Sequence, residues 1–108
     1  MEEIKVGEYV RTESGYIGKV EQINKEPTDE NITYVITDVH SCFLEEVVKH
    51  SFNIIDLIEE GDYVNGEKVT DTWNGNRIET HRSNFHEDNI KSIVTKEMME
   101  SIEYKVGD

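Results

Sequence analysis

The stretch EGDYVNGEKV, residues 60–69, repeats in shortened form the stretch VGEYVRTESGYIGKV, residues 6–20. In both stretches a Gly and an acid precede Tyr-Val, and both stretches end on Lys-Val. Landmarks that recur in a fixed order are typical of a duplicated structural unit. The sequence therefore predicts two related halves, which we place at residues 1–58 and 59–108.

A second match lies late in each half. LEEVVKHS, residues 44–51, resembles HEDNIKSI, residues 86–93, in an alignment that matches Lys49 with Lys91. A half of this size buries too little surface to be more than marginally stable alone. The halves are therefore expected to share a core, to pack against each other, or to associate with a second copy of the chain.

Alternation of apolar and polar residues predicts β-strands in both halves. In ITYVIT, residues 32–37, Ile32, Tyr34 and Ile36 alternate with threonines, which predicts a strand with one buried face. The preceding polar stretch NKEPTDEN, residues 24–31, predicts a loop because it contains Pro27.

Turns and helices are indicated at few places. The pair Asn65-Gly66 tolerates positive φ at both positions, so it predicts a two-residue hairpin. NIIDLI is expected to form about one helical turn, and Thr95 is expected to cap a short helix over KEMMES. A final strand, IEYKV, is predicted at residues 102–106.

The order of these elements resembles the opening of KOW-type and related SH3-like modules. The resemblance implies a mainly β fold of two tandem SH3-like small barrels packed together, filled by tyrosine and valine, with a short C-terminal helix. KOW-type modules are usually basic and serve ribosomes or transcription, whereas this chain is acidic. The residues that carry the resemblance are Gly7, Tyr9, Val10, Gly15, Gly18, Lys19 and Val20.

In amino-acid sequence, the chain also resembles small proteins encoded by phages and prophages of low-GC Gram-positive bacteria. The most suggestive stretches are IIDLIEEGDYVNG and IKSIVTKE. This resemblance brings no catalytic or binding residues that could be transferred to the chain. It implies a phage context and no particular mechanism.

The chain carries 24 acidic and 11 basic residues, a formal net charge of −13, and the acids are spread along its length. Such a field repels phosphate backbones and anionic lipid, so direct binding to nucleic acid or to a membrane is not expected. A basic host protein would be attracted. The alternative is that the acids serve solubility alone.

The single cysteine, Cys42, excludes an internal disulfide, and the chain need not fold in an oxidising compartment. The acidic start MEEIKVGEY does not resemble a signal peptide, and the apolar clusters are too short to span a bilayer. We therefore expect a cytoplasmic protein. A homo-oligomer is possible.

No catalytic constellation is recognisable, which predicts a protein that is not an enzyme and uses no cofactor. His40, Cys42, His81 and His86 are the right residue types for zinc, but their spacing matches no zinc template, so no metal site is predicted. Exposed histidines are the simpler interpretation.

One stretch of the second half suggests a ligand site. On a hairpin, Arg77 and His81 would share a face, and a guanidinium near the ring of Trp73 is suited to a nucleotide or phosphate. The alternative is that these bases pair with neighbouring carboxylates and that Trp73 lies in the core.

The leading hypothesis is a non-catalytic acidic binding protein, an anti-CRISPR-like inhibitor and nucleic-acid mimic encoded by a phage. Its target would be a host nucleic-acid-binding or defence protein. The alternatives are a protein that sequesters a small anionic ligand such as a nucleotide, through Trp73, Arg77 and His81, and a virion-associated structural module. The predicted acidic binding surface comprises Glu45, Glu46, Glu59, Glu60, Asp62, Glu87 and Asp88.

Overall fold

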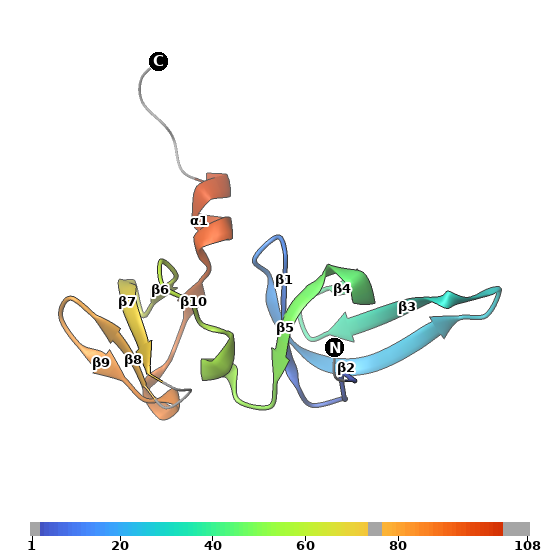
Figure 1. The fold of residues 1–108 in the computed structure, drawn as a ribbon, viewed down its shortest axis with the longest axis horizontal. Coiled ribbons are helices and arrows are strands. Elements are labelled where there is room, and N and C mark those ends of the chain that lie inside the picture. Colours follow the sequence, from blue (N-terminus) through green and yellow to red (C-terminus); the bar gives the residue numbers. More distant parts are fainter. Residues whose placement is uncertain (1–2, 74–76, 103–108) are drawn as a thin grey trace, which may run out of the picture. The chain divides into compact units, whose positions relative to one another are not determined.

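A computed structural model describes residues 3–73 and 77–102, apart from the side chains of Glu30 and Trp73 (Figure 1). The chain divides into two compact units, Met1–Leu57 (unit 1) and Ile58–Asp108 (unit 2). The boundary expected from the repeat, between residues 58 and 59, lies one residue after this division.

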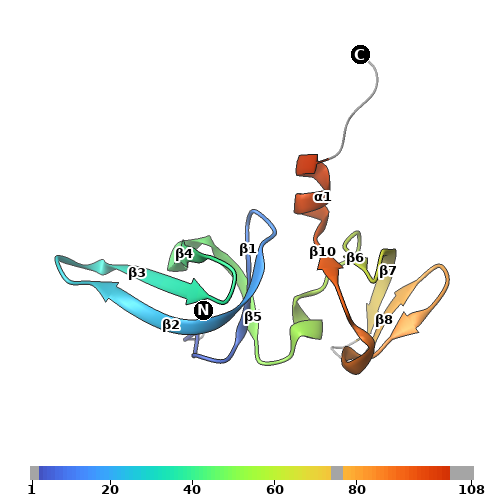
Figure 2. The same cartoon turned by 180° about the vertical axis from the view of Figure 1, so that it is seen from behind.

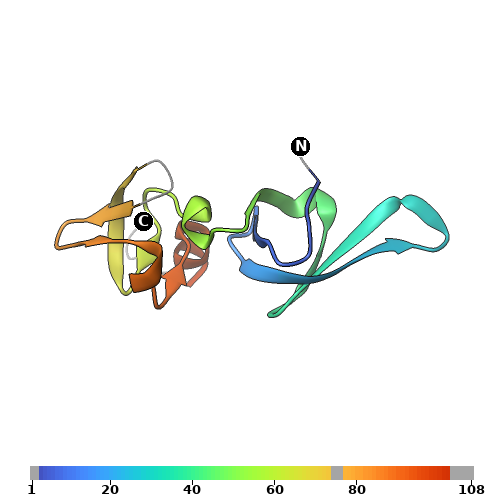
Figure 3. The same cartoon turned by 90° about the horizontal axis from the view of Figure 1, so that it is seen from below.

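Unit 1 is a five-stranded antiparallel sheet in the order β4-β3-β2-β1-β5. The β2–β3 hairpin runs out beyond the other strands of the unit (Figure 3). One 3₁₀ turn joins β4 to β5 and a second follows β5. The elements are β1 (Tyr9–Thr12), β2 (Ile17–Glu26), β3 (Asp29–Thr37), β4 (Ser41–Phe43), η1 (Leu44–Glu46), β5 (Val47–Ser51) and η2 (Ile54–Leu57).

Unit 2 has a five-stranded antiparallel sheet in the order β9-β8-β7-β6-β10, which is the strand order of unit 1 with shorter strands. Its last strand leads directly into α1 (Figure 2). The elements are β6 (Tyr63–Val64), β7 (Glu67–Trp73), β8 (Arg77–Thr80), β9 (Asn84–Phe85), η3 (Glu87–Asn89), β10 (Ile93–Val94) and α1 (Lys96–Ile102).

The quoted repeat corresponds to one backbone arrangement that is built twice. The Gly7 N–H donates to the Val20 carbonyl at 2.9 Å, and the Gly61 N–H donates to the Val69 carbonyl at 3.0 Å. Both glycines have positive φ, +97° and +95°, a region that side chains with a Cβ rarely adopt. The predicted match between the two stretches is confirmed.

The buried cores are also duplicated. Strand pairing places the buried side chains at matching positions in three pairs: Val10 and Val64, Val20 and Val69, and Val35 and Ile78. Tyrosine does not fill these cores: Tyr16 is 47% exposed, and Tyr9 and Tyr63 are half-buried. Aliphatic side chains suit the small interior of a short five-stranded sheet better than long rings that carry a hydroxyl.

The predicted strand in residues 32–37 is present, but its buried face is the opposite one. Val35 and Thr37 are buried, whereas Tyr34 and Ile36 are half-buried. The Thr37 hydroxyl donates to the His40 carbonyl at 2.7 Å within the β3–β4 turn. Because this bond satisfies the hydroxyl locally, a threonine can face the core.

The polar loop expected at residues 24–31 is instead largely strand. β2 continues to Glu26 and β3 begins at Asp29, so the turn is reduced to Pro27 and Thr28. The fixed φ of proline suits a tight turn. The Tyr34 hydroxyl donates to Glu26 at 3.1 Å and so links the two strands. Polar composition therefore did not distinguish a protruding hairpin from a loop.

The Asn65-Gly66 hairpin is confirmed, with φ of +52° and +82°. Thr95 precedes α1, and its hydroxyl accepts a hydrogen bond from the Met98 N–H at 3.3 Å, as a helix cap does. Ile102, expected to begin a final strand, is the last residue of α1. Residues 103–106 lie outside the described residues.

The late match between the halves is shifted by one residue. Phe43 precedes η1 and His86 precedes η3, both with extended backbone. Lys91 therefore corresponds to Val48, and Lys49 corresponds to Ser92. Strand pairing agrees, because Val10 lies opposite His50 and Val64 lies opposite Ile93. A short segment of charged residues can be aligned with another in more than one register. Strand pairing allows only one of these registers.

The prediction of a mainly β fold with a short C-terminal helix is confirmed. Closure is not found: in the described residues each sheet stays open, and neither closes into a barrel. None of the helices in the described ranges is long and apolar enough to cross a bilayer.

Candidate functional site

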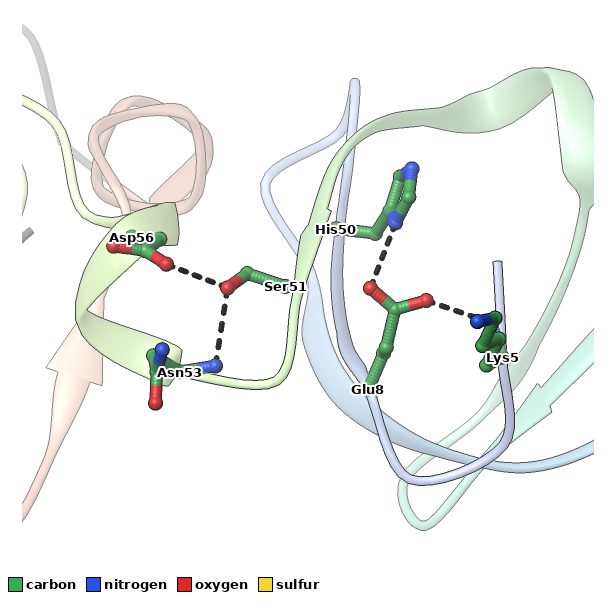
Figure 4. A network of polar contacts seen from close by, with 6 residues as sticks. All are labelled: Lys5, Glu8, His50, Ser51, Asn53 and Asp56. Carbon is green, nitrogen blue, oxygen red and sulfur yellow. Dashed lines mark hydrogen bonds and ion pairs between the residues drawn. The ribbon is translucent and has the colours of Figure 1, made fainter. Parts of the chain in front are cut away.

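Among the carboxylates that the structure describes in unit 1, the buried one belongs to Glu8, which directly precedes β1 (Figure 4). It accepts a hydrogen bond from the Lys5 N–H at 2.6 Å and lies 2.9 Å from His50 Nδ1 on β5. Burial raises the pKa of Glu8, but the bonds from His50 and Lys5 outweigh it, so the pKa lies below its ordinary value. The fold therefore favours a charged carboxylate here.

A shallow pocket of about 470 Å³ opens beside this carboxylate. Phe52, which is 58% exposed, lies at this pocket and over Gly7. The pocket thus combines charged groups with one aromatic ring. Its lining residues are Glu3, Lys5, Glu8, His50 and Phe52.

Ser51 follows His50 in sequence, but its hydroxyl is engaged elsewhere. The Ser51 hydroxyl donates to Asp56 at 2.6 Å and accepts the Asn53 N–H at 3.0 Å (Figure 4). Consecutive residues of a strand point to opposite faces, so His50 and Ser51 diverge. Glu8, His50 and Ser51 therefore do not form an acid–base–nucleophile triad.

Asp62 is the counterpart of Glu8 in unit 2, and it is fully buried. Its two carboxylate oxygens accept the Glu59 N–H at 2.7 Å and the Lys96 N–H at 2.9 Å. These bonds tie the turn before β6 to the start of α1. The assignment of Asp62 to a partner-binding surface is therefore wrong, because its carboxylate serves the interior of the fold.

A second shallow pocket, of about 480 Å³, lies in unit 2. One of its two lysines, Lys96, is held by Glu59, with 2.8 Å between Nζ and Oε1. This hydrogen bond raises the pKa of Lys96. The lining residues are Gly61, Tyr63, Lys68, Lys96, Met99 and Glu100.

The other predicted acids occupy turns. Glu45 and Glu46 are the last two residues of η1, Glu87 and Asp88 are the first two residues of η3, and Glu59 and Glu60 lie in the turn before β6. The structure thus repeats an acidic pair in both units. Glu46 also accepts the Phe43 N–H at 2.7 Å.

The proposed anion-binding residues are only partly brought together. Trp73 pairs with Arg77 at one end of the β7–β8 hairpin, and the Trp73 side chain lies outside the described residues. His81 follows the opposite end of β8, and both Arg77 and His81 are exposed. Four residues of extended strand separate Arg77 from His81 by about 13 Å. The alternation of side chains along a strand predicted that Arg77 and His81 share one face, but it does not take this distance into account.

The histidines and the cysteine considered for zinc have other environments. The His40 ring lies 4.9 Å from the Tyr16 ring, and its Nδ1 is 3.3 Å from the Thr37 hydroxyl. Burial raises the pKa of the Cys42 thiol. In the part of the chain that the structure describes, no group of three or more His, Cys, Asp or Glu could hold a metal ion.

Comparisons with protein-family models, curated proteins and solved structures found no match. Sequence reasoning missed the contact between Glu8 and His50, because the two residues lie 42 positions apart. The available signal was the alignment of Glu8 with Asp62, which marks this acid as part of the repeated backbone.

Proposed function

We propose that the protein is a non-catalytic acidic binding protein that engages a basic partner protein through its exposed carboxylates. The observation that carries this proposal is the distribution of acids. Among the Asp and Glu side chains that the structure describes, only Glu8 and Asp62 are buried. The remainder reach solvent on a chain of net charge −13.

The sign of this field selects the class of partner. Phosphate backbones and anionic membranes are repelled, whereas a basic groove is attracted from a distance and binds faster at low salt. The acidic turns η1 and η3 place such charges in both units.

We propose further that the partner is a host nucleic-acid-binding or defence protein, and that this protein inhibits it as a phage-encoded nucleic-acid mimic. Carboxylates can occupy a groove that otherwise holds phosphates, because both are anions that accept hydrogen bonds from Arg and Lys. The net charge and the resemblance of the sequence to phage-encoded proteins support this proposal.

We also propose that the two units are SH3-like repeats. Support comes from the shared strand order and from the 3₁₀ turn before the last strand of each sheet. The nucleotide-sequestering alternative loses its geometric support, because Arg77 and His81 lie at opposite ends of β8. The virion-associated module stays a prediction.

The test begins with capture on the full-length chain from extract of the bacterial host. A captured basic nucleic-acid-binding protein is then purified, and its affinity is measured as salt is raised. We expect the affinity to fall steeply with salt. We also expect the protein to block nucleic-acid binding by that partner. Binding that is absent or insensitive to salt contradicts the proposal.

A variant that neutralises three exposed acids, E45Q/E60Q/D88N, sharpens this test. It should bind several-fold more weakly at low salt and should show a smaller salt dependence. The control is N84Q, an exposed change that leaves the charge unaltered and should bind like wild type.

A further inference from the structure

Unit 1 exposes large apolar side chains that unit 2 does not. With the exception of Ile102, the exposed large apolar residues in the described chain belong to unit 1. They are Val6, Tyr16, Val39, Phe43, Leu44, Val48 and Phe52. Because both units build the same strand order, unit 2 serves as an internal control for what the fold itself requires.

The backbone gives the counterparts of these residues in unit 2. Val39 and Arg82 each donate an N–H at 3.3 Å to the threonine two positions earlier, Thr37 or Thr80. The alignment of η1 with η3 gives two further pairs, and the alignment of Gly7 with Gly61 gives a fourth. The pairs are Val39 and Arg82, Leu44 and Glu87, Val48 and Lys91, and Val6 and Glu60.

In each pair the residue of unit 2 is charged. The fold therefore does not require an apolar side chain at these positions. Exposed apolar groups are costly in water, and when they gather they commonly mark an interaction site. The apolar residues of unit 1 thus call for an explanation other than packing.

These residues are densest around η1. Phe43, Leu44 and Val48 are 44%, 37% and 50% exposed and lie within six residues of sequence. The Phe43 ring lies 5.4 Å from that of Tyr34 on the neighbouring strand. We call Tyr34, Phe43, Leu44, Glu45 and Val48 the η1 surface. In sequence, Phe43, Leu44 and Val48 flank Glu45, whose side chain is exposed.

We propose that the η1 surface is the docking surface for the basic partner, an inference that rests on the proposed function. Its occupant is a partner segment that carries aliphatic side chains next to Arg or Lys. The aliphatic groups cover Leu44 and Val48, and the cations face Glu45. A second copy of the chain fits less well, because two copies at −13 each repel.

The test uses the full-length chain and two synthetic peptides, acetyl-(Arg-Leu)4-amide and acetyl-(Arg-Ser)4-amide, which have equal charge. Amide chemical shifts are recorded during titration at low salt. The Arg-Leu peptide should bind more tightly and should shift the amides of residues 43–48 more than those of residues 86–91.

The decisive variant is L44E/V48K, which installs the residues of unit 2 and keeps the net charge at −13. It should weaken binding of the Arg-Leu peptide by about tenfold, because two apolar contacts are lost. Binding of the Arg-Ser peptide should not change. The control T72E/N84K installs the same two residue types at exposed positions of unit 2, keeps the net charge, and should leave both affinities unchanged. If L44E/V48K loses its dispersed spectrum, L44S/V48S takes its place.

Equal binding of the two peptides, or wild-type affinity in L44E/V48K, would overturn the docking surface and leave the proposed function intact. Failure of both peptides to bind at low salt would count against the docking surface and the proposed function alike. Self-association of the wild-type chain in sedimentation, lost in L44E/V48K, would replace the basic partner with a second copy and overturn the proposal.

Discussion

Units 1 and 2 contain the same turn, but the buried acid of this turn has a different second hydrogen-bond partner in each unit. In each unit an acid accepts the N–H of the residue three positions earlier, Lys5 for Glu8 and Glu59 for Asp62. The remaining oxygen faces a histidine ring in unit 1, but in unit 2 it faces the backbone N–H of Lys96. The first hydrogen bond is part of the repeated turn. The second differs because a histidine ring lies near the acid in unit 1 and a backbone N–H lies near it in unit 2.

A second difference concerns the contact between a turn and a strand. In unit 1 the β3–β4 turn contacts β2, and in unit 2 the β8–β9 turn contacts β7. Thr37 packs against Gly18, where an added Cβ would come within 2.5 Å of the threonine Oγ1. Thr80 instead donates its hydroxyl to Glu67, the counterpart of Gly18, at 2.7 Å. The same turn is thus accommodated by an absent side chain in unit 1 and by a hydrogen bond in unit 2.

The largest expected effect is at Asp62. The D62A substitution removes the acceptor of two part-buried N–H groups, so it should lower the free energy of unfolding by about 3 kcal/mol. Urea unfolding of the full-length chain measures this change. The control D71A removes an exposed acid and should cost less than about 0.5 kcal/mol. A loss below about 1 kcal/mol in D62A would show that water satisfies these amides.

The next effect is at Gly18. G18A forces the new methyl group against Thr37, so it should destabilise the protein by about 2 kcal/mol. The matched change in unit 2, E67A, removes one hydrogen bond and should cost about 1 kcal/mol. Amide hydrogen exchange in β1 and β6 assigns each loss to its unit. Equal losses for the two variants would mean that Thr37 moves aside at little cost.

The smallest effect is the pH dependence of Glu8. Its pKa in the folded state lies below the ordinary value of 4.5, so the stabilisation is present above pH 4.5 and is lost as pH falls through the folded pKa. The difference in unfolding free energy between wild type and E8Q should therefore shrink between pH 6 and pH 3. A constant difference over this range would contradict the assigned bonds to His50 and Lys5.

Local signals were sufficient where one residue type decides the backbone. Gly7 and Gly61 require positive φ, Asn65-Gly66 closes a tight hairpin, and Thr95 caps a helix, so these features could be predicted. The late match failed by one residue, because pairing across β1 and β5 decides its register. The buried face of β3 failed for the same kind of reason, since alternation gives two faces but does not say which one meets the core.

The candidate site was harder to predict than the fold. Glu8 and His50 meet through strand pairing across 42 residues, and Arg77 and His81 are separated by the length of β8. Composition indicated the acidic surface in general. It did not separate the buried Asp62 from the exposed Glu60, because neighbouring acids have the same chemistry until the fold gives them different surroundings.

The amino-acid sequence by itself determined the duplication, the β character and the negative field, because repeated landmarks, alternation and charge are local or additive properties. Only the tertiary structure decided which acids are buried, which face of each strand meets the core, and that unit 1 exposes apolar groups where unit 2 carries charge. These properties depend on contacts between residues far apart in the chain, and such contacts are fixed when strands pair and side chains leave water together.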